Sequence, residues 1–252
     1  MTEQETSPTL VKRFGVVEVI TLNRPSALNA LNAPLVRSLM DALLGSTAHV
    51  IVMTGAGRAF CSGQDLTEAV QAEDYGCHLR DRYNPLVRTV FAGRTPVVAA
   101  VNGLATGAGL ALALAAPWRV MAASATLAGG FLGVALAPDC GLSFTLPRLV
   151  GPARALSILG AGEPLSASEA LEIGLVNAVL PDEGFLDAAQ RYAQQVAAVP
   201  ANAWAATRRL IEPDALAALD AALEREAVEQ KALGASSEHL ERLRLFLERP
   251  RR

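Results

Sequence analysis

Two glycine-rich turns and one aspartate are the groups in this sequence whose types and spacing could do chemistry. One turn, Gly107-Ala108-Gly109, follows an apolar run at 97–101 and opens an Ala/Leu-rich segment that stops at Pro117. Glycine lets backbone approach a ligand closely, and the first N–H groups of a helix have no intrahelical partners. Such a turn can present donors to an oxyanion or a phosphate. The alternative is a buried strand-turn-helix whose glycines serve only packing.

The other turn, GAGRAFCSGQDL at 55–66, follows a short apolar run at 49–54, and the aspartate lies further along the chain. Asp139 stands in Pro138-Asp139-Cys140-Gly141, which is a strong turn signal. A carboxylate in an apolar pocket has a raised pKa, which makes it a better base near neutral pH. Apolar residues just before it could supply such walls: Leu127, Phe131, Leu132, Val134 and Leu136. The alternative role for Asp139 is that of a turn-forming residue after proline.

Composition and charge exclude several classes of protein. Hydrophobic residues make up 51% of the 252 residues, which indicates a globular protein rather than a disordered one. The net charge of −3 gives no field that favours nucleic acid or an anionic membrane. No apolar run reaches the ~20 residues of a membrane span, and the polar N-terminus lacks the profile of a secretory signal. We therefore expect a cytoplasmic protein without nucleic-acid or membrane partners.

Cysteines and histidines give little support to a metal site. The three cysteines have no metal-type spacing, their odd number argues against a disulfide framework, and the three histidines are scattered. These residues are Cys61, Cys77, Cys140, His49, His78 and His239. We expect no metal, and a reducing compartment.

Strands alternate with helices along most of the chain, which favours an α/β fold. Strands are expected at residues 9–12, 16–22, 49–54, 97–101, 119–122 and 176–180, and helices at 34–44, 78–91, 153–159 and, with a capping box, 166–173. A polar, mobile segment is expected at 67–77. Everything after Asp182 has a helical pattern, and the apolar residues of 213–247 should pack on a second subunit or on the chain's own domain.

The two turns together closely resemble the crotonase, or enoyl-CoA hydratase/isomerase, superfamily. The resemblance is carried by IVMTGAGRAFCSGQDL at 51–66 and VVAAVNGLATGAGLALAL at 97–114, and supported by VITLNRPSALNAL at 19–31, LPRLVGPARAL at 146–156 and LSASEALEIGLVNAVL at 165–180. It covers roughly residues 9–200, with a weaker match beyond. It implies a crotonase-like ββα spiral at 1–200 with the CoA-thioester site, and a helical region at 201–252 that mediates trimers or dimers of trimers.

The resemblance also implies how the two turns act on an acyl-CoA thioester. The backbone N–H groups of Gln64 and Ala108 would stabilise the oxyanion of a thioester enolate, where loss of one donor costs about 3 kcal/mol. Because backbone donates, the side chains at these two positions could vary. Coenzyme A would be part of the substrate, so no further cofactor is expected. The other substrate-binding positions are Arg24, Ala27, Leu28, Gly63, Asp65, Leu66, Gly107 and Phe131; Arg24 could instead be a surface cation, and Asp65 could cap the following turn.

The catalytic side chains separate this sequence from the hydratase branch of that superfamily. Hydratases carry two glutamates, at positions matched here by Ala111 and about Phe131, and neither can exchange a proton. The resemblance places Asp139 where isomerases of ring-epoxide and 3-enoyl-CoA thioesters keep an acid. An aromatic dehalogenase of the same superfamily also keeps an aspartate there and uses it as a nucleophile. The motifs GRAFCSGQDL, YNPLVR, NGLATGAG and PDCG are most similar to the ring-epoxide isomerases of phenylacetate catabolism.

The resemblance therefore favours an isomerase in which Asp139 shuttles a proton, with a place in fatty acid or phenylacetate catabolism. A hydratase with other acid/base residues and a catalytically weak CoA-thioester binding protein remain as alternatives.

Overall fold

The computed structural model describes residues 7–69 and 74–248. Residues 1–6, 70–73 and 249–252 lie outside the described residues. They include part of the segment expected to be polar and mobile and most of the polar N-terminus.

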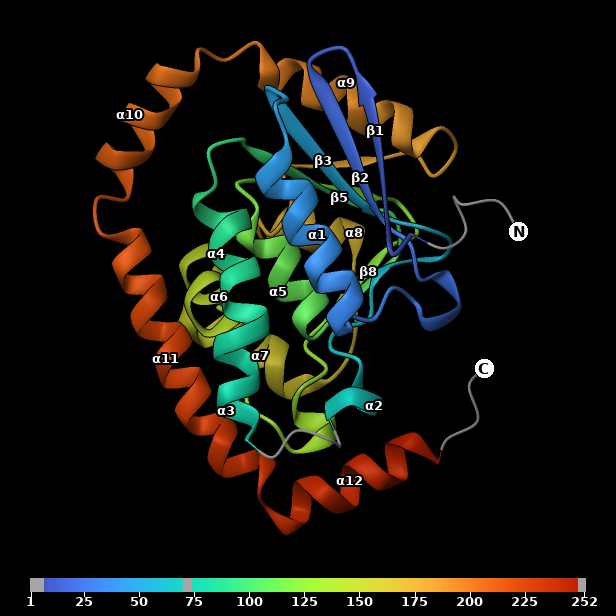
Figure 1. Ribbon diagram of the computed structural model, residues 1–252, viewed down its shortest axis with the longest axis vertical. Helices are drawn as coiled ribbons and strands as arrows, with labels where there is room; N and C mark the ends of the chain where they lie inside the picture. The colour runs from blue at the N-terminus through green and yellow to red at the C-terminus, as the bar shows by residue number, and fades with distance from the viewer. Residues whose placement is uncertain (1–6, 70–73, 249–252) are drawn as a thin grey trace.

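The strands form two sheets, and from β3 to β8 successive strands belong alternately to one sheet and the other (Figure 1). The first has six strands in the order β1-β2-β3-β5-β7-β10, parallel except for the β1–β2 hairpin. Its strands are β1 (Thr9–Phe14), β2 (Val17–Leu22), β3 (Val50–Gly55), β5 (Val97–Val101), β7 (Trp118–Ala122) and β10 (Ala178–Leu180). The second has the order β4-β6-β8-β9, with β4 (Ala59–Cys61), β6 (Leu104–Thr106), β8 (Thr126–Ala128) and β9 (Leu165–Ser166).

Each central strand of the first sheet leads directly into a short strand of the second and then into helix. The pairs β3 and β4, β5 and β6, and β7 and β8 follow this rule, and successive strands pair in parallel in both sheets. The repeat is a ββα unit stacked into a spiral, so the α/β fold class is confirmed. Sequence patterns missed the second sheet, because strands of two or three residues inside glycine-rich turns carry no period-2 pattern.

Helices cover the sheets and fill the space between them. They are α1 (Ala33–Gly45), α2 (Leu66–Ala69), α3 (Tyr75–His78), α4 (Asn84–Ala92), α5 (Ala108–Ala115), α6 (Leu142–Val150), α7 (Pro152–Ala161), α8 (Ala167–Glu172), α9 (Phe185–Ala197), α10 (Ala201–Ile211), α11 (Ala215–Gly234) and α12 (Ser237–Leu247). Short helical turns at Pro25–Ala27, Leu79–Tyr83 and Leu132–Val134 complete them. The expected capping box between Ser166 and Glu169 is present.

Helix α5 is buried at every residue, which agrees with its all-apolar Ala/Leu sequence. It lies inside the molecule between α4 and α6 (Figure 1). Its first residue, Ala108, is the middle residue of the turn Gly107-Ala108-Gly109. The site-forming turn is therefore anchored in the core.

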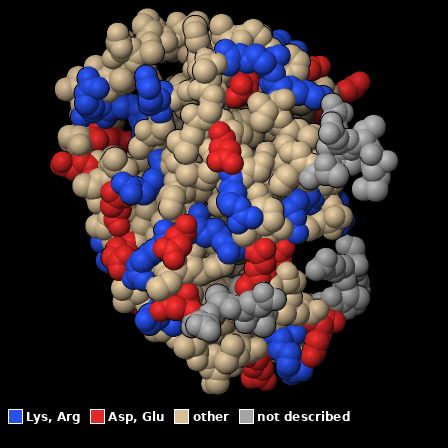
Figure 2. Space-filling model, viewed as in Figure 1, with Lys and Arg blue, Asp and Glu red and all other residues tan. Residues whose placement is uncertain are grey.

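The C-terminal helices wrap around the body, with α11 running alongside α3, α4 and α6 (Figure 1). Of the two expectations for this region, packing on the chain's own domain is what the described residues show. Ion pairs such as Arg80–Glu224 and Arg88–Asp220 join α11 to the body, within a surface where both charge signs are intermingled (Figure 2). Such exposed pairs contribute only about 0–1 kcal/mol each.

The expectation of a mobile segment at 67–77 is wrong where the segment is described. Helix α2 begins at Leu66, and α3 begins at Tyr75, three residues before the expected start of the helical stretch. A Cβ on Gly76 would stand 2.5 Å from the Ala227 carbonyl oxygen, so α3 lies directly on α11. Asp74 caps α3 and pairs with Lys231 on α11. These contacts with α11 hold residues 74–77 against the body.

Across residues 7–69 and 74–248, every helix is too short or too polar to cross a membrane.

Candidate active site

The two glycine turns meet at Gly63 and Gly107. A Cβ on Gly63 would stand 3.1 Å from the Thr106 carbonyl oxygen and 3.4 Å from the Ala108 nitrogen, and φ there is +99°. At Gly109 a Cβ would stand 2.1 Å from the Cys61 carbonyl oxygen, so the first turn of α5 lies directly on β4. Glycine is required for this contact, and the contact brings the two expected donors to the same place.

The backbone N–H of Gln64 points towards the turn at Gly107-Ala108-Gly109. Leu31 pairs with Gln64 in a parallel bridge, donating to the Gly63 oxygen at 2.8 Å and accepting from the Asp65 nitrogen at 3.0 Å. In such a pattern the N–H of Gln64 itself faces away from Leu31. That opposite edge is where β4 pairs with β6, which leads into Gly107.

The N–H of Ala108 is the first of α5 and has no intrahelical acceptor. The preceding N–H, that of Gly107, is already used: it donates to the Gly129 oxygen at 3.0 Å. The turn at Gly129-Gly130 thus holds the second glycine turn, and the buried Phe131 follows it. Gly107 and Phe131 support this side of the site.

Asp139 is brought to the first glycine turn from 75 residues away. Its side chain is buried, and its Oδ2 accepts hydrogen bonds from Gln64 Nε2 at 2.9 Å and from Gln230 Nε2 at 2.8 Å. Its other oxygen, Oδ1, is buried without a hydrogen-bond partner among the described residues. The side chain of Gln64 therefore has a partner of its own in the candidate site, which the sequence argument, based on its backbone N–H alone, did not anticipate.

Helix α11 forms hydrogen bonds with the loop of Asp139 both before and after that residue. Gln230 Nε2 also donates to the Ala137 oxygen at 2.9 Å. One turn earlier, Glu226 accepts from the Gly141 nitrogen at 2.8 Å and the Ser143 nitrogen at 3.0 Å, which caps the start of α6.

Sequence reasoning missed both Gln230 and Glu226, although a signal existed. They continue the helical stripe begun by Leu219 and Leu223, and a polar residue at the apolar position of such a stripe is expected to have a buried partner.

Burial gives both carboxyl groups near this loop raised pKa values. It raises the pKa of Asp139 to about 6, against the opposing effects of the neighbouring Cys140 thiol and of the hydrogen bonds from Gln230 and Gln64. It raises the pKa of Glu226 to about 7, where hydrogen bonds from Ser143 and Gly141 oppose it and the charge of Asp139 adds to it. A carboxyl group with a pKa near neutral suits proton transfer at physiological pH.

Among the described residues, Asp139 is the buried carboxyl group that has one oxygen without a hydrogen-bond partner. Asp139 and Glu226 are the buried acids there, and both oxygens of Glu226 accept hydrogen bonds. The two positions matched to hydratase glutamates, Ala111 and Phe131, are buried and carry no ionisable group.

The two buried cysteines are not activated. Burial raises the pKa of Cys61 to about 12 and raises that of Cys140 well above its ordinary value. Both thiols therefore remain protonated at neutral pH. No cluster of three metal-ligating side chains occurs within residues 7–69 and 74–248.

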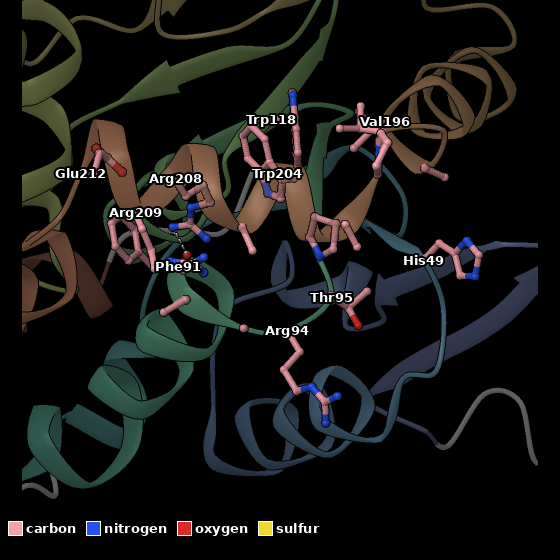
Figure 3. A pocket seen from close by; sticks show the side chains of 18 of the residues that line it. His49, Phe91, Arg94, Thr95, Trp118, Val196, Trp204, Arg208, Arg209 and Glu212 are labelled. Atoms are coloured by element: carbon pink, nitrogen blue, oxygen red, sulfur yellow. Dashed lines mark hydrogen bonds between the residues drawn. The ribbon is translucent and has the colours of Figure 1, made fainter.

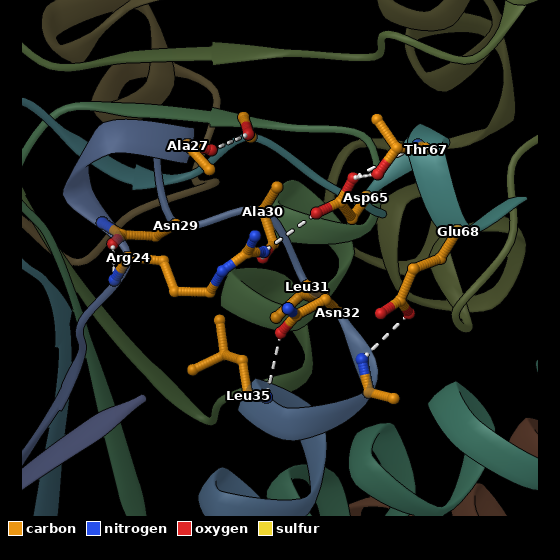
Figure 4. Close-up of polar contacts among 12 residues, drawn as sticks. Arg24, Ala27, Asn29, Ala30, Leu31, Asn32, Leu35, Asp65, Thr67 and Glu68 are labelled. Atoms are coloured by element: carbon orange, nitrogen blue, oxygen red, sulfur yellow. Dashed lines mark hydrogen bonds and ion pairs between the residues drawn. The ribbon is translucent and has the colours of Figure 1, made fainter. Parts of the chain in front are cut away.

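The residues expected to hold coenzyme A also come together, at the edge of the site (Figure 4). Arg24 Nη1 donates to Asp65 Oδ2 at 3.0 Å and to the Ala30 oxygen at 2.5 Å. Ser62 N–H donates to the Leu28 oxygen at 3.0 Å. Asp65 also accepts from the Thr67 nitrogen and hydroxyl, so it caps the next turn as well.

Asn29 organises this loop and was missed from the sequence. It is fully buried with φ +57°, donates to the Ala56 and Ala59 oxygens at 2.9 and 2.8 Å, and accepts from the Arg24 nitrogen at 2.9 Å. The signal was its residue type, because asparagine tolerates the left-handed region better than most residues.

The apolar walls suggested for Asp139 are only partly as expected. Leu127, Phe131, Val134 and Leu136 are buried, whereas Leu132 is 51% exposed and is no wall. Leu132 begins a single helical turn that presents it outward. Leu66 packs against Val134, Leu136 and Tyr75 in a small cluster apart from the main core.

A separate cleft of about 780 Å³ lies between α10 and the body (Figure 3). Trp118 and Trp204 stack in it with ring centroids 4.3 Å apart, and Arg208 donates to the Phe91 oxygen at 2.8 Å. None of the expected site residues lines it.

Comparisons with known proteins agree with this architecture. The family model described as "Enoyl-CoA hydratase/isomerase" matches residues 13–251. A protein named "Probable enoyl-CoA hydratase" from Rhodobacter capsulatus is 41% identical over 234 residues, which cover 92% of this chain and 91% of that protein. The 1,2-epoxyphenylacetyl-CoA isomerase of Escherichia coli is 37% identical over 240 residues, covering 92% of each.

A solved structure of an enoyl-CoA hydratase from Mycobacterium avium subsp. paratuberculosis superposes with a TM-score of 0.85 at 32% identity, covering 95% of this chain and 98% of that one. The chain therefore belongs to the enoyl-CoA hydratase/isomerase family, with the crotonase fold.

Proposed function

We propose that this chain is an acyl-CoA isomerase in which Asp139 moves a proton while the N–H groups of Gln64 and Ala108 stabilise an enolate. One observation supports it above the rest: Asp139 is buried and held through Oδ2 by two glutamines, one of them Gln64 of the turn at 55–66, while Oδ1 has no partner among the described residues. Such a carboxylate has one oxygen for orientation and one for proton transfer.

The chemistry needs a single carboxylate. The C–H bond next to the thioester carbonyl breaks, its proton goes to Asp139 Oδ1, and the electron pair forms the enolate whose oxygen the two N–H groups receive. The electron pair then takes the same proton back at the far end of the conjugated system. Addition of water would instead require a paired acid and base, and the positions for that pair hold Ala111 and Phe131.

In this proposal coenzyme A is held by the loop of Arg24, Ala27 and Leu28 together with Gly63 and Asp65. Leu66, Gly107 and Phe131 complete the substrate site. The Arg24–Asp65 pair supports this arrangement, because it places a cation and a shaped backbone loop at the edge of the site. No cofactor beyond the coenzyme A of the substrate is required.

The decisive experiment is turnover of 3-enoyl-CoA to 2-enoyl-CoA by Asp139→Asn. We expect turnover to fall about 1,000-fold, since general acid–base groups contribute about 10²–10⁴, while CoA-ester affinity is kept. Asp182→Asn is the matched control, because Asp182 accepts from Ser124 at the surface. Unchanged turnover in Asp139→Asn would rule the proposal out.

A hydratase with other acid/base residues is the second candidate, supported by the name of the Rhodobacter capsulatus relative. Fast hydration of crotonyl-CoA by the wild-type protein, kept in Asp139→Asn, would favour it. Binding without turnover of either thioester would instead indicate a CoA-thioester binding protein.

We also propose a cytoplasmic enzyme that assembles as a trimer or a dimer of trimers. Leu210 and Ile211 on α10 are 83% and 73% exposed, which supports a partner surface at this end of the molecule. Light scattering on the purified protein tests this, and a monomer at micromolar concentration would contradict it.

A further inference from the structure

A small apolar cluster lies apart from the main core, against the part of α11 that follows Gln230, the partner of Asp139. It consists of Tyr75, Val134 and Leu136, with Leu66 and Leu233 packed against them. These side chains come from α2, α3, the segment before Asp139 and α11. We call it the Tyr75 cluster.

The ring of Tyr75 is held in one position. A Cβ on Gly234 would stand 2.8 Å from its Cδ2 atom, so α11 lies against one face of the ring. The ring packs edge-on against His239 and His78, with centroids 5.5 and 6.3 Å away. The side chain is only 5% exposed. Tyr75 cannot swing to another partner without moving α3 off α11.

The hydroxyl of Tyr75 has no hydrogen-bond partner in the described structure, although its oxygen is buried. A buried tyrosine hydroxyl ordinarily finds a partner. Four other buried polar atoms of the described residues are equally unpaired: Asp139 Oδ1, Gln64 Oε1, His78 Nε2 and Asn84 Oδ1. The amide of Gln64 is oriented by its contact with the carboxylate, so Nε2 faces Asp139 and Oε1 faces elsewhere.

Tyr75 lies close enough to Asp139 to feel its charge. Burial raises the pKa of Tyr75, and the charge of Asp139 raises it further. The phenol therefore stays protonated and acts only as a donor towards a substrate oxygen. The phenol and the unpaired Asp139 Oδ1 belong to one region, because Gly234 contacts the Tyr75 ring one turn of α11 after Gln230, which contacts Asp139.

We infer that Tyr75 is a specificity-determining residue whose hydroxyl donates a hydrogen bond to an oxygen atom on the acyl group, so that the site selects oxygen-bearing acyl-CoA thioesters over purely hydrocarbon ones. The inference rests on the proposed function for its acyl-CoA ligand. The carbon skeleton lies against the apolar members of the Tyr75 cluster. The ligand oxygen belongs to an epoxide, a ring ether or a hydroxyl, and a hydroxyl can also donate to Gln64 Oε1.

A site built in this way penalises a ligand without the oxygen, because the buried donor is then left unpaired. Discrimination therefore lies in Tyr75 and not in Asp139, which moves the proton for either kind of substrate. The two residues can be separated experimentally.

The test is calorimetric binding of two unreactive thioesters, phenylacetyl-CoA and ortho-hydroxyphenylacetyl-CoA, to the full-length protein. We expect the wild type to prefer the hydroxylated ligand about tenfold, the size of one net hydrogen bond. Tyr75→Phe should abolish this preference and bind phenylacetyl-CoA with affinity within about twofold of the wild type, since the variant removes an atom that has no partner.

Tyr83→Phe is the matched control. The Tyr83 hydroxyl is buried but donates to the Leu31 oxygen at 3.0 Å, so its loss should lower the melting temperature and leave the ratio of the two affinities unchanged. A wild type without preference, or a Tyr75→Phe variant that keeps it, overturns the inference. If the preference depends on Tyr75 while Asp139→Asn keeps full turnover, the inference stands and the proposed function falls.

Discussion

The two halves of the candidate site are built from different materials. The donor half, at Gly63–Gln64 and Gly107-Ala108, consists of backbone held by glycine contacts inside the core. The proton-transfer half, at Asp139, consists of a side chain held by two other side chains, Gln64 and, from α11, Gln230. Backbone donors tolerate a change of side chain but not an added Cβ at the contact glycines. A side-chain carboxylate depends on each of its partners.

The largest expected effect breaks the donor half. Gly109→Ala places a Cβ 2.1 Å from the Cys61 carbonyl oxygen, so α5 and β4 must separate. We expect loss of turnover, together with a loss of about 3 kcal/mol in the free energy of unfolding, because of the steric conflict in the core. Thermal melting and the isomerase assay measure both.

Gly133→Ala is the control for that change, because nothing lies within 4 Å of a Cβ at Gly133. A Gly109→Ala protein with wild-type melting and turnover would show that the two halves do not differ as described.

The next effect concerns the charge at the heart of the other half. The folded-state pKa of Asp139, about 6, lies above its ordinary value of 3.8. A raised carboxyl pKa contributes stability that is present below pH 3.8 and is lost as pH rises through 6. Asp139→Asn has no such charge to bury and should therefore be the more stable protein at pH 8, by about 2–3 kcal/mol. Urea unfolding at pH 4 and pH 8 measures the difference, and an equal or smaller stability of the variant at pH 8 would contradict it.

A smaller effect separates the two contributions of Gln64. Gln64→Ala keeps the backbone N–H but removes the donor to Asp139 Oδ2, and Gln230→Leu removes the other donor. Each should lower kcat about tenfold and raise the pKa of the acidic limb of the kcat profile, because a hydrogen bond to the carboxylate form is lost. KM should change little. An unchanged pH profile in both variants would show that the glutamines do not position Asp139.

The smallest effect lies outside both halves. Arg24→Ala breaks the pair with Asp65, and both side chains are only partly exposed. We expect KM for acyl-CoA to rise about tenfold with kcat unchanged, as for a loss of uniform binding. Arg242→Ala, which breaks an exposed ion pair with Glu238 on α12, offers a comparison for the loss of a surface cation. A fall in kcat with KM unchanged would show that Arg24 acts on the chemistry instead of on binding.

Local pattern was enough to predict several parts of this protein. The glycine turns, the Asp139 turn, the long strands and the capped helix at 166–173 each depend on residues adjacent in sequence, and the structure has them where expected. The family resemblance similarly placed Arg24 and Asp65 in one region, and they are in contact. The roles of these residues remain predictions.

What depends on distant segments was decided only by the tertiary structure. Gln230 reaches Asp139 from 91 residues away, and Tyr75 is fixed because α3 lies on α11. The second sheet exists because four short strands from separate segments pair with one another, although none of them has a strand pattern of its own. The physical reason is the same in each case: residue types determine which donors, acids and turns a chain possesses. Only packing determines which of them are buried together, and burial sets both the pKa of Asp139 and the partners left to its free oxygen.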